Sequence, residues 1–274
     1  MKAYRRLVVP YFVWLALMIL IPMLLIAFYA FTSPNTNEII QINFTLENFK
    51  KFFDPVFISV LWKSLKIALI TTVICLVVGY PLAFIISRQS ERSQTMWILL
   101  VTIPMWINML IRTYAWMSLL ADKGLINSFL GLFGLGPLKM MYTDFAVILG
   151  MVYNFLPFMI LQIYNVLSRM DESLIEASYD LGADKYKTFR KVIFPLSLSG
   201  VISGITLVFL PAVSTFVIPQ LLGGGGYALI GNLIEKQFVQ IGNWNFGSAI
   251  SLIMAVIIMF SISLTNKFER EEKE

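Results

Sequence analysis

One stretch of this 274-residue chain gathers the side chains that could do chemistry. From residue 172 to residue 184 a carboxylate recurs at every fourth position, and four basic side chains follow at once. A spacing of four places the carboxylates on one face of a helix. Such a charged stretch is either a solvated loop helix or a surface that contacts a partner. The acidic residues are Glu172, Glu176, Asp180 and Asp184, and the basic ones are Lys185, Lys187, Arg190 and Lys191.

Two residues should interrupt and end this helical stretch. Gly182 interrupts the helix at a cost of about 1 kcal/mol relative to alanine. Pro195 should end the loop, because the residue before a proline is disfavoured in the helical region. Long uncharged runs lie on both sides, at 145–168 and 192–234. The sequence therefore predicts a charged loop that is held close to a membrane.

The residue types exclude several chemistries. The chain has no histidine, which removes the commonest general base and the commonest metal ligand. Its one cysteine, Cys75, lies in an apolar run and provides neither a disulfide framework nor a thiolate cluster. Four glycines at 223–226 suggest a phosphate cradle, but a P-loop ends in Gly-Lys-Ser/Thr and no lysine follows here. We therefore expect no catalytic residue, no metal site and no cofactor in this chain, and a flexible outer loop or broken helix end at the glycines.

The composition indicates a membrane protein. Hydrophobic residues make up 58% of the chain and charged residues 14%, whereas a soluble domain has roughly 25% charged residues. A spanning helix needs about 20 mainly apolar residues, and the uncharged intervals hold six such segments. The expected fold is all-α, a polytopic membrane protein with six transmembrane helices. The spans are predicted near residues 8–31, 58–86, 95–118, 145–167, 196–220 and 244–266.

Basic residues favour one orientation of these spans. With the N-terminus inside, the inner segments hold 13 of the 21 lysines and arginines, and inner loops carry the excess of such residues in membrane proteins. Both termini and the charged loop are therefore predicted to be cytoplasmic. The inner residues are Lys2, Arg5, Arg6, Arg88, Arg92, Arg169, Lys185, Lys187, Arg190, Lys191, Lys267, Arg270 and Lys273.

The spacing around Gly182 is similar to that of a known loop. A Glu-Ala-Ser triplet is followed after three residues by a glycine, and after nine more by Val-x-Phe-Pro. This resembles the EAA loop of type I ABC-importer permeases, in which Glu-Ala-Ala, Gly and Ile-x-Leu-Pro stand at the same distances. Glu176, Ala177, Gly182 and Pro195 match that pattern, whereas Ser178, Val192 and Phe194 depart from it.

Further stretches, from about residue 58 to the end of the sixth span, narrow the resemblance. They look like the B-type permease of spermidine/putrescine importers, although permeases for other small solutes are similar. A second alternative is a secondary transporter or channel that needs no ATPase. The predicted spans lack the acid or histidine relay of a proton-driven carrier. The stretches are RTYAW at 112–116, LPFMILQIY at 156–164, EASYDLGA at 176–183, LLGG at 221–224 and GNLIEKQF at 231–238.

The resemblance implies a permease subunit of the bacterial plasma membrane that receives polyamines from an extracytoplasmic binding protein. It also implies a heterodimer with a second, C-type permease and a cytoplasmic ATPase dimer, which would bind ATP and Mg. The implied organisation is a first spanning helix and outer loop at 1–57, a permease domain at 58–266 with the EAA loop at 168–195, and a cytoplasmic tail at 267–274.

The resemblance also places the ATPase contact at Gly182. Glu176 is expected to head a helical turn whose acidic face, with Asp180, pairs with arginines of the ATPase. A side chain at Gly182 should obstruct the meeting of two short helices. Pro195 should set where the fifth span begins.

A substrate path is expected among polar and aromatic residues of the spans. An asparagine and an arginine inside a span usually face the bundle interior or a water-filled cavity, although Arg112 would also fit the outer headgroup zone. Aromatic faces hold cations by contacts worth about 0.5–2 kcal/mol each, and the alternative for these aromatics is simple packing. The expected path residues are Asn108, Tyr114, Trp116, Ser214 and Phe216.

Overall fold

The computed structural model describes residues 10–33 and 43–271, with side chains described up to residue 263. Within these residues the regular structure is helical, and a lone antiparallel bridge joins Thr32 to Phe44. Of the basic residues used to predict the orientation, Lys2, Arg5, Arg6 and Lys273 lie outside the described residues, as do the first two residues of the predicted first span.

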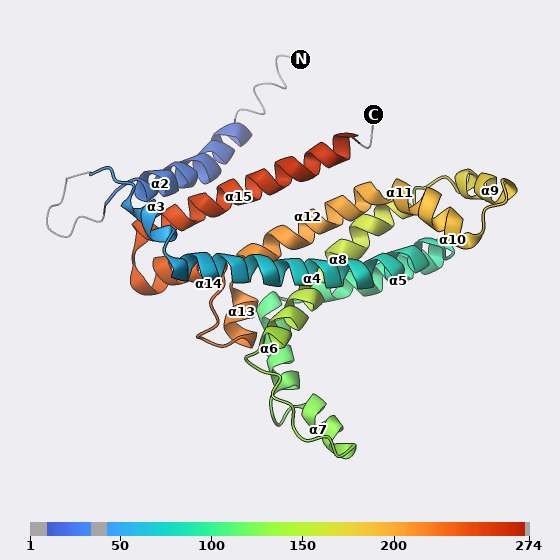
Figure 1. Cartoon of the computed structure of the whole chain (residues 1–274), viewed down its shortest axis with the longest axis horizontal. Coiled ribbons are helices and arrows are strands. Elements are labelled where there is room, and N and C mark those ends of the chain that lie inside the picture. The colour runs from blue at the N-terminus through green and yellow to red at the C-terminus, as the bar shows by residue number, and fades with distance from the viewer. Residues whose placement is uncertain (1–9, 34–42, 272–274) are drawn as a thin grey trace, which may run out of the picture. The chain divides into compact units, whose positions relative to one another are not determined.

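Two compact units make up the chain (Figure 1). The first combines Met1–Leu61 with Gly231–Phe260, and the second combines Trp62–Ile230 with Ser261–Glu274. The helices of the first unit are η1 (Ala16–Leu20), α2 (Ile21–Ala30), α3 (Glu47–Phe52), the start of α4 (Pro55–Ser87), α14 (Ile230–Glu235), η3 (Lys236–Ile241) and most of α15 (Trp244–Glu271).

Two buried asparagines fasten the end of α2 to its neighbours in the first unit. Asn48 of α3 donates from Nδ2 to the carbonyl oxygens of Ala30 (3.1 Å) and Thr32 (2.9 Å). Asn245 of α15 donates to the carbonyl oxygens of Tyr29 (3.1 Å) and Thr32 (2.8 Å). The last carbonyls of a helix have no partner within it. The Asn48 amide supplies one to the Ala30 carbonyl, whereas the Tyr29 carbonyl already accepts from Thr32 and gains a further bond from Asn245.

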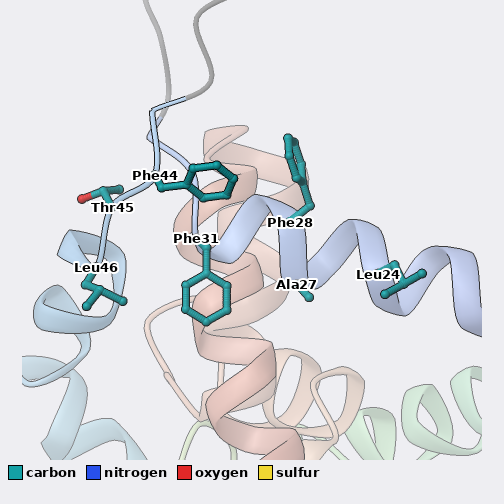
Figure 2. Close-up of a pocket in the computed structure, with 7 residues that line it drawn as sticks. All are labelled: Leu24, Ala27, Phe28, Phe31, Phe44, Thr45 and Leu46. Carbon is teal, nitrogen blue, oxygen red and sulfur yellow. The ribbon is translucent and has the colours of Figure 1, made fainter.

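A pocket of about 490 Å³ opens beside the same helix end (Figure 2). Among its lining residues, Thr45 alone carries a polar side chain, and its hydroxyl already accepts a hydrogen bond from the Glu47 N–H at 3.1 Å. The pocket therefore presents a mainly apolar surface. Its lining residues are Leu24, Ala27, Phe28, Phe31, Phe44, Thr45 and Leu46.

The second unit is organised on two helices, α8 and α12, which pack against each other. Glycines on α12 permit this approach. A Cβ atom added at Gly200 would lie 2.9 Å from the Gln162 carbonyl oxygen, and one added at Gly204 would lie 2.6 Å from the Met159 sulfur. Small residues bring spanning helices together in this way. The other helices of the unit are the rest of α4 from Trp62, α5 (Glu91–Trp106), α6 (Met109–Leu120), α7 (Leu125–Leu132), α9 (Glu172–Asp180), α10 (Lys185–Thr188), η2 (Phe189–Ile193), α11 (Phe194–Leu196) and α13 (Val217–Leu222), beside α8 (Asp144–Leu167) and α12 (Leu198–Ser214).

Four of the six predicted spans occur as single helices that are long and apolar enough to cross a membrane. The prediction of 145–167 differs from α8 by one residue, and that of 244–266 shares its first residue with α15. The other two spans occur as pairs of helices that are bent by 90° and 59°. The helical fold class is thus confirmed, and two spans are wrong as continuous helices. The four single helices are Pro10–Ala30, Pro55–Ser87, Asp144–Leu167 and Trp244–Ser263.

The third predicted span, 95–118, breaks between α5 and α6. Pro104 removes a backbone donor near the end of α5, and Ile107 is extended (φ −81°, ψ 136°). Asn108 then caps α6, because its side-chain oxygen accepts the Leu110 N–H at 2.8 Å. The sequence signal for this break was a proline followed four residues later by a good N-cap residue.

The fifth predicted span, 196–220, also ends early. Pro211 lies inside α12, and Thr215 is extended (φ −64°, ψ 143°), so the helix stops at Ser214. A separate short helix, α13, follows from Val217.

We expect the close approach of α8 and α12 to make Gly200 intolerant of a side chain. Gly200→Ala gains about 1 kcal/mol in helix propensity, but its Cβ would meet backbone atoms of α8, and overpacking costs about 1–3 kcal/mol. The matched control is Gly131→Ala in α7, where an added Cβ has nothing within 4 Å. Thermal unfolding in detergent should show a lower midpoint for Gly200→Ala and an unchanged or higher one for Gly131→Ala. Equal midpoints would contradict the packing argument.

Candidate functional site

The charged loop folds as two short helices, each with an aspartate cap. The Asp171 carboxylate accepts the Ser173 N–H at 3.0 Å and caps α9. The Asp184 carboxylate accepts the Lys187 N–H at 2.8 Å and caps α10. These backbone hydrogen bonds are the main reason that the pKa values of Asp171 and Asp184 lie below the usual value. Both caps therefore remain ionised at neutral pH, where each stabilises its helix start.

The prediction that four carboxylates share one helix is wrong for one of the four. Glu172, Glu176 and Asp180 share α9, but that helix ends at Asp180, and Asp184 belongs to the next one. Glu176 also lies in the middle of α9 and does not head it. A four-residue spacing continues through a turn unchanged, so the spacing alone could not locate the end of the helix.

Gly182 makes the turn between the two helices. Its φ is +80°, in the left-handed region that glycine adopts without strain. Its N–H donates to the Tyr179 carbonyl at 2.9 Å, and the Ala183 N–H donates to the Ser178 carbonyl at 3.0 Å, which is the Schellman ending of a helix. A Cβ added at Gly182 would meet nothing within 4 Å. The expected obstruction by a side chain is therefore wrong within this chain, and the glycine is needed for its backbone angle.

A pair of buried hydroxyls joins the two helices. Ser178 Oγ lies 2.8 Å from Thr188 Oγ1, and it also donates to the Ile175 carbonyl at 2.9 Å. Because Ser178 has one hydroxyl proton, Thr188 is the donor in the bond between them. Both side chains are buried. The residue that departs from the Glu-Ala-Ala pattern thus provides a fixed contact between α9 and α10.

Pro195 does not end the helix. Phe194 before it is helical (φ −63°, ψ −49°), and the chain bends at Ser197, between α11 and α12. The π-helical turn η2 lies just before this proline, whereas α4 and α8 continue through Pro81 and Pro157 without such a turn, so a proline alone does not end a helix in this chain. Pro22 follows the π-helical turn η1 at the same distance, and the helix Pro10–Ala30 likewise continues through it.

The bend at Ser197 is attached to α4. Ser197 Oγ lies 2.8 Å from the Tyr80 hydroxyl, and both residues are buried. The rings of Phe189 and Phe194 lie 5.8 Å and 5.9 Å from the Tyr80 ring. Movement of the charged loop would therefore reach α4 as well as α12.

The sequence reasoning missed the exposed apolar residues of the loop, of which two are the most exposed. Leu181, just before Gly182, is 89% exposed, and Tyr186 on α10 is 70% exposed. Ala177, Glu176 and Asp180 are exposed as well. A leucine and a tyrosine within a charged loop were the available signal, since large exposed apolar side chains between polar ones are typical of interaction surfaces.

Of the predicted substrate-path residues, Trp116 lies beside an aromatic residue that the prediction did not include, Tyr153. Trp116 of α6 lies 5.4 Å from Tyr153 of α8, and the Arg112 guanidinium lies 6.0 Å from the same ring. The Nε and Nη1 atoms of Arg112 are buried and have no hydrogen-bond partner among the described residues, so of its two predicted settings the interior one is favoured. The helix α6 also packs against α13, which begins just after Phe216.

The other path residues are placed differently. Asn108 is exposed, and its side chain is used as the cap of α6. Tyr114 is exposed, and Ser214 donates its hydroxyl proton to the Leu210 carbonyl of its own helix at 3.1 Å. Within the described residues, no group of three or more acidic or cysteine side chains could hold a metal ion.

Comparison with known proteins decides the class of this helical bundle. Residues 76–272 match the family described as the inner membrane component of binding-protein-dependent transport systems. The chain belongs to this family.

Curated relatives agree with this membership. The permease is 39% identical over 253 residues to the spermidine/putrescine transport system permease protein PotB of Haemophilus influenzae, covering 92% of this chain and 88% of the relative. It is 39% identical to PotB of Escherichia coli K12, covering 89% and 90%. It is 31% identical to the inner membrane ABC transporter permease protein YdcU of the same organism, covering 81% and 75%.

Solved structures show the same fold. A bacterial alginate ABC transporter in complex with an alginate-pentasaccharide-bound periplasmic protein contains a chain with a TM-score of 0.82 at 14% identity, covering 98% of the permease and 94% of that chain. The MetNI methionine ABC transporter, in an inward-facing conformation, gives a TM-score of 0.60 at 17% identity, covering 78% and 95%. The permease therefore has the fold of a type I ABC importer permease and is a multi-pass membrane protein.

Proposed function

We propose that the permease is one of two membrane subunits of an ATP-driven importer for polyamines such as spermidine and putrescine. The observation that carries the proposal is the 39% identity to spermidine/putrescine permeases over about nine-tenths of the chain. Aromatic faces support it: Trp116 and Tyr153 lie together on neighbouring helices, and aromatic faces attract ammonium groups.

The partners follow from the same proposal. An extracytoplasmic binding protein delivers the polyamine, and a second, C-type permease completes the path. A cytoplasmic ATPase dimer binds ATP and Mg, so hydrolysis belongs to the partner. The family description names a binding-protein-dependent system, and a chain of the same fold occurs in a complex with a periplasmic protein.

The charged loop is the proposed ATPase contact. Its exposed face presents Leu181 and Tyr186 beside the acidic residues Glu176 and Asp180. The hydroxyl pair Ser178–Thr188 holds its two helices as one body. The chain bends by 59° between this body and α12, and at the bend Ser197 is hydrogen-bonded to Tyr80 of α4. A displacement of the loop therefore moves both α4 and α12.

The substrate proposal is tested with the complete importer in proteoliposomes. A polyamine-loaded binding protein should stimulate ATP hydrolysis and drive uptake of labelled putrescine or spermidine. Binding proteins loaded with an amino acid or a sugar are the controls. Stimulation by the controls and none by the polyamine-loaded protein would rule out this substrate class.

The orientation proposal has both termini and the charged loop in the cytoplasm, on the basis of the lysine and arginine distribution. In a Cys75→Ser background, Lys187→Cys should react with an impermeant maleimide only after the membrane is opened, because Lys187 is exposed on the loop. Labelling of intact cells from outside would reverse the orientation.

The coupling proposal predicts a graded response at Gly182. Gly182→Asn should be mild, because asparagine tolerates a positive φ. Gly182→Ala should cost about 1–2 kcal/mol in loop stability through the left-handed backbone alone. Gly182→Asp has nearly the shape of asparagine and adds a charge at the contact, so transport and stimulated ATP hydrolysis should fall together.

Transport and co-purification of the ATPase are measured for each variant at matched membrane abundance. Glu176→Ala should be milder than Gly182→Asp, because an ion pair at a rim contributes only about 0–1 kcal/mol. Full transport and full ATPase binding by Gly182→Asp would show that the loop is only a solvated connector.

A further inference from the structure

A lysine, an aspartate and a tyrosine meet at the start of α8, and the proposed function does not use them. The Lys63 ammonium lies 3.7 Å from the Asp144 carboxylate and 3.6 Å from the centre of the Tyr227 ring. The Tyr227 hydroxyl donates to the same carboxylate at 2.5 Å. Lys63 thus has two specific partners within its own unit.

The glycine loop holds Tyr227 in place. A Cβ at Gly223 would collide with the Tyr227 ring, and Gly224 has a φ of +82°. The Tyr227 N–H donates to the Gly224 carbonyl at 2.9 Å, and after the loop the Ile230 N–H donates to Ser64 Oγ of α4 at 2.8 Å. The glycines therefore follow the end of α13 as a hydrogen-bonded turn that places one aromatic ring, which agrees with the broken helix end among the two expected alternatives.

The arrangement has the chemistry of a receptor for a primary ammonium group. A carboxylate supplies the counter-charge, and an aromatic face supplies a cation–π contact. Burial and the neighbouring Asp144 carboxylate raise the pKa of Tyr227, so its hydroxyl stays a donor and fixes the carboxylate. A lysine side chain ends in a four-carbon alkylammonium, the same group that ends a putrescine molecule.

We propose that Asp144 and Tyr227 form a binding site for a primary alkylammonium group of the transported polyamine, and that Lys63 occupies this site until the polyamine displaces it. The inference rests on the proposed function for the identity of the solute. It adds an internal competitor, which sets how tightly the permease holds the solute.

Access and position fit this role. The side chains of Lys63 and Asp144 are 41% and 62% exposed, and exposed ion pairs are weak enough to exchange with a solute ion. A pocket of about 750 Å³ adjoins them and is lined partly by Trp62 and Phe209. The site lies at the start of α8, whereas the charged loop follows its end, about 36 Å away for a 24-residue helix. In the proposed orientation this is the outer end, where the binding protein releases its solute.

The test measures labelling of the complete importer by putrescine that carries a photoreactive diazirine, in lipid discs without amino lipids. Lys63→Gln removes the internal competitor, so half-maximal labelling near Asp144 and Tyr227 should occur at an about two- to sixfold lower probe concentration. The matched control is Lys66→Gln, which removes the same charge from the same pocket and should change labelling less than twofold.

The two receptor groups are tested separately. Tyr227→Leu removes the ring and should weaken labelling about two- to thirtyfold, whereas Tyr227→Phe keeps the ring and should lose less. Asp144→Asn in the Lys63→Gln background should abolish the gain. Adducts are mapped to the peptides that contain residues 144 and 227.

Four results would overturn the proposal, and the last of them depends on the separate test of the proposed function. If Lys63→Gln weakens labelling, the cluster only stabilises the local structure. A gain equal to that of Lys66→Gln would show general electrostatics. Loss of labelling in discs with phosphatidylethanolamine would assign the site to a lipid headgroup. Failure of the unmodified importer to transport any polyamine would instead overturn the proposed function, whereas normal transport with adducts elsewhere would overturn this inference alone.

Discussion

Every helix that crosses a membrane must satisfy its own backbone, because the hydrocarbon core offers no hydrogen-bond partner. In the permease this constraint becomes visible wherever a helix is interrupted. At Asn108 a side-chain oxygen caps the new helix start, and at Ser197 the hydroxyl donates to the Phe194 carbonyl at 2.9 Å. At Asn48 and Asn245, in the other unit, amides cover the carbonyls at the end of α2. Interruptions thus occur where the chain supplies a replacement partner, and these are also the points at which a helix can change direction.

The helix α8 connects the two proposed sites of the second unit, the ammonium site at its start and the charged loop after its end. Its start carries Asp144, which receives Lys63 and Tyr227, and its end leads into the charged loop. Between them it packs along α12, with Gly200 against its backbone. A close-packed pair of helices transmits displacement because the interface has no space to absorb it. A movement of the loop and a change of occupancy at Asp144 would therefore act on the same rigid pair.

In the charged loop, local hydrogen bonds and tertiary contacts determine different features of the structure. Aspartate caps and the Schellman turn at Gly182 are local features that short peptides also use. They decide where α9 ends and α10 begins, but they do not decide the angle at which the pair meets the spans. The Ser178–Thr188 bond and the contact of Phe189 and Phe194 with Tyr80 decide that angle, and they join residues from five elements.

The amino-acid sequence by itself determined the membrane class, the position of four of the spans and the family of the loop, because these depend on the length of apolar runs and on fixed spacings. It could not determine that 95–118 and 196–220 are broken, since a proline is compatible with both a kinked and an interrupted helix. Pro195 shows the reverse case, where the residue before a proline stays helical and the chain bends only at Ser197.

Only the tertiary structure decided which charges meet. Lys63, Asp144 and Tyr227 are separated by about eighty residues at each step of the chain, and no spacing rule links them. Their meeting depends on the packing of α4 beside α8 and on a glycine turn that is too tight for any Cβ at Gly223. Residues so far apart in the sequence meet only when the helices that carry them pack together. That packing depends on many contacts at once, and no local sequence pattern predicts it.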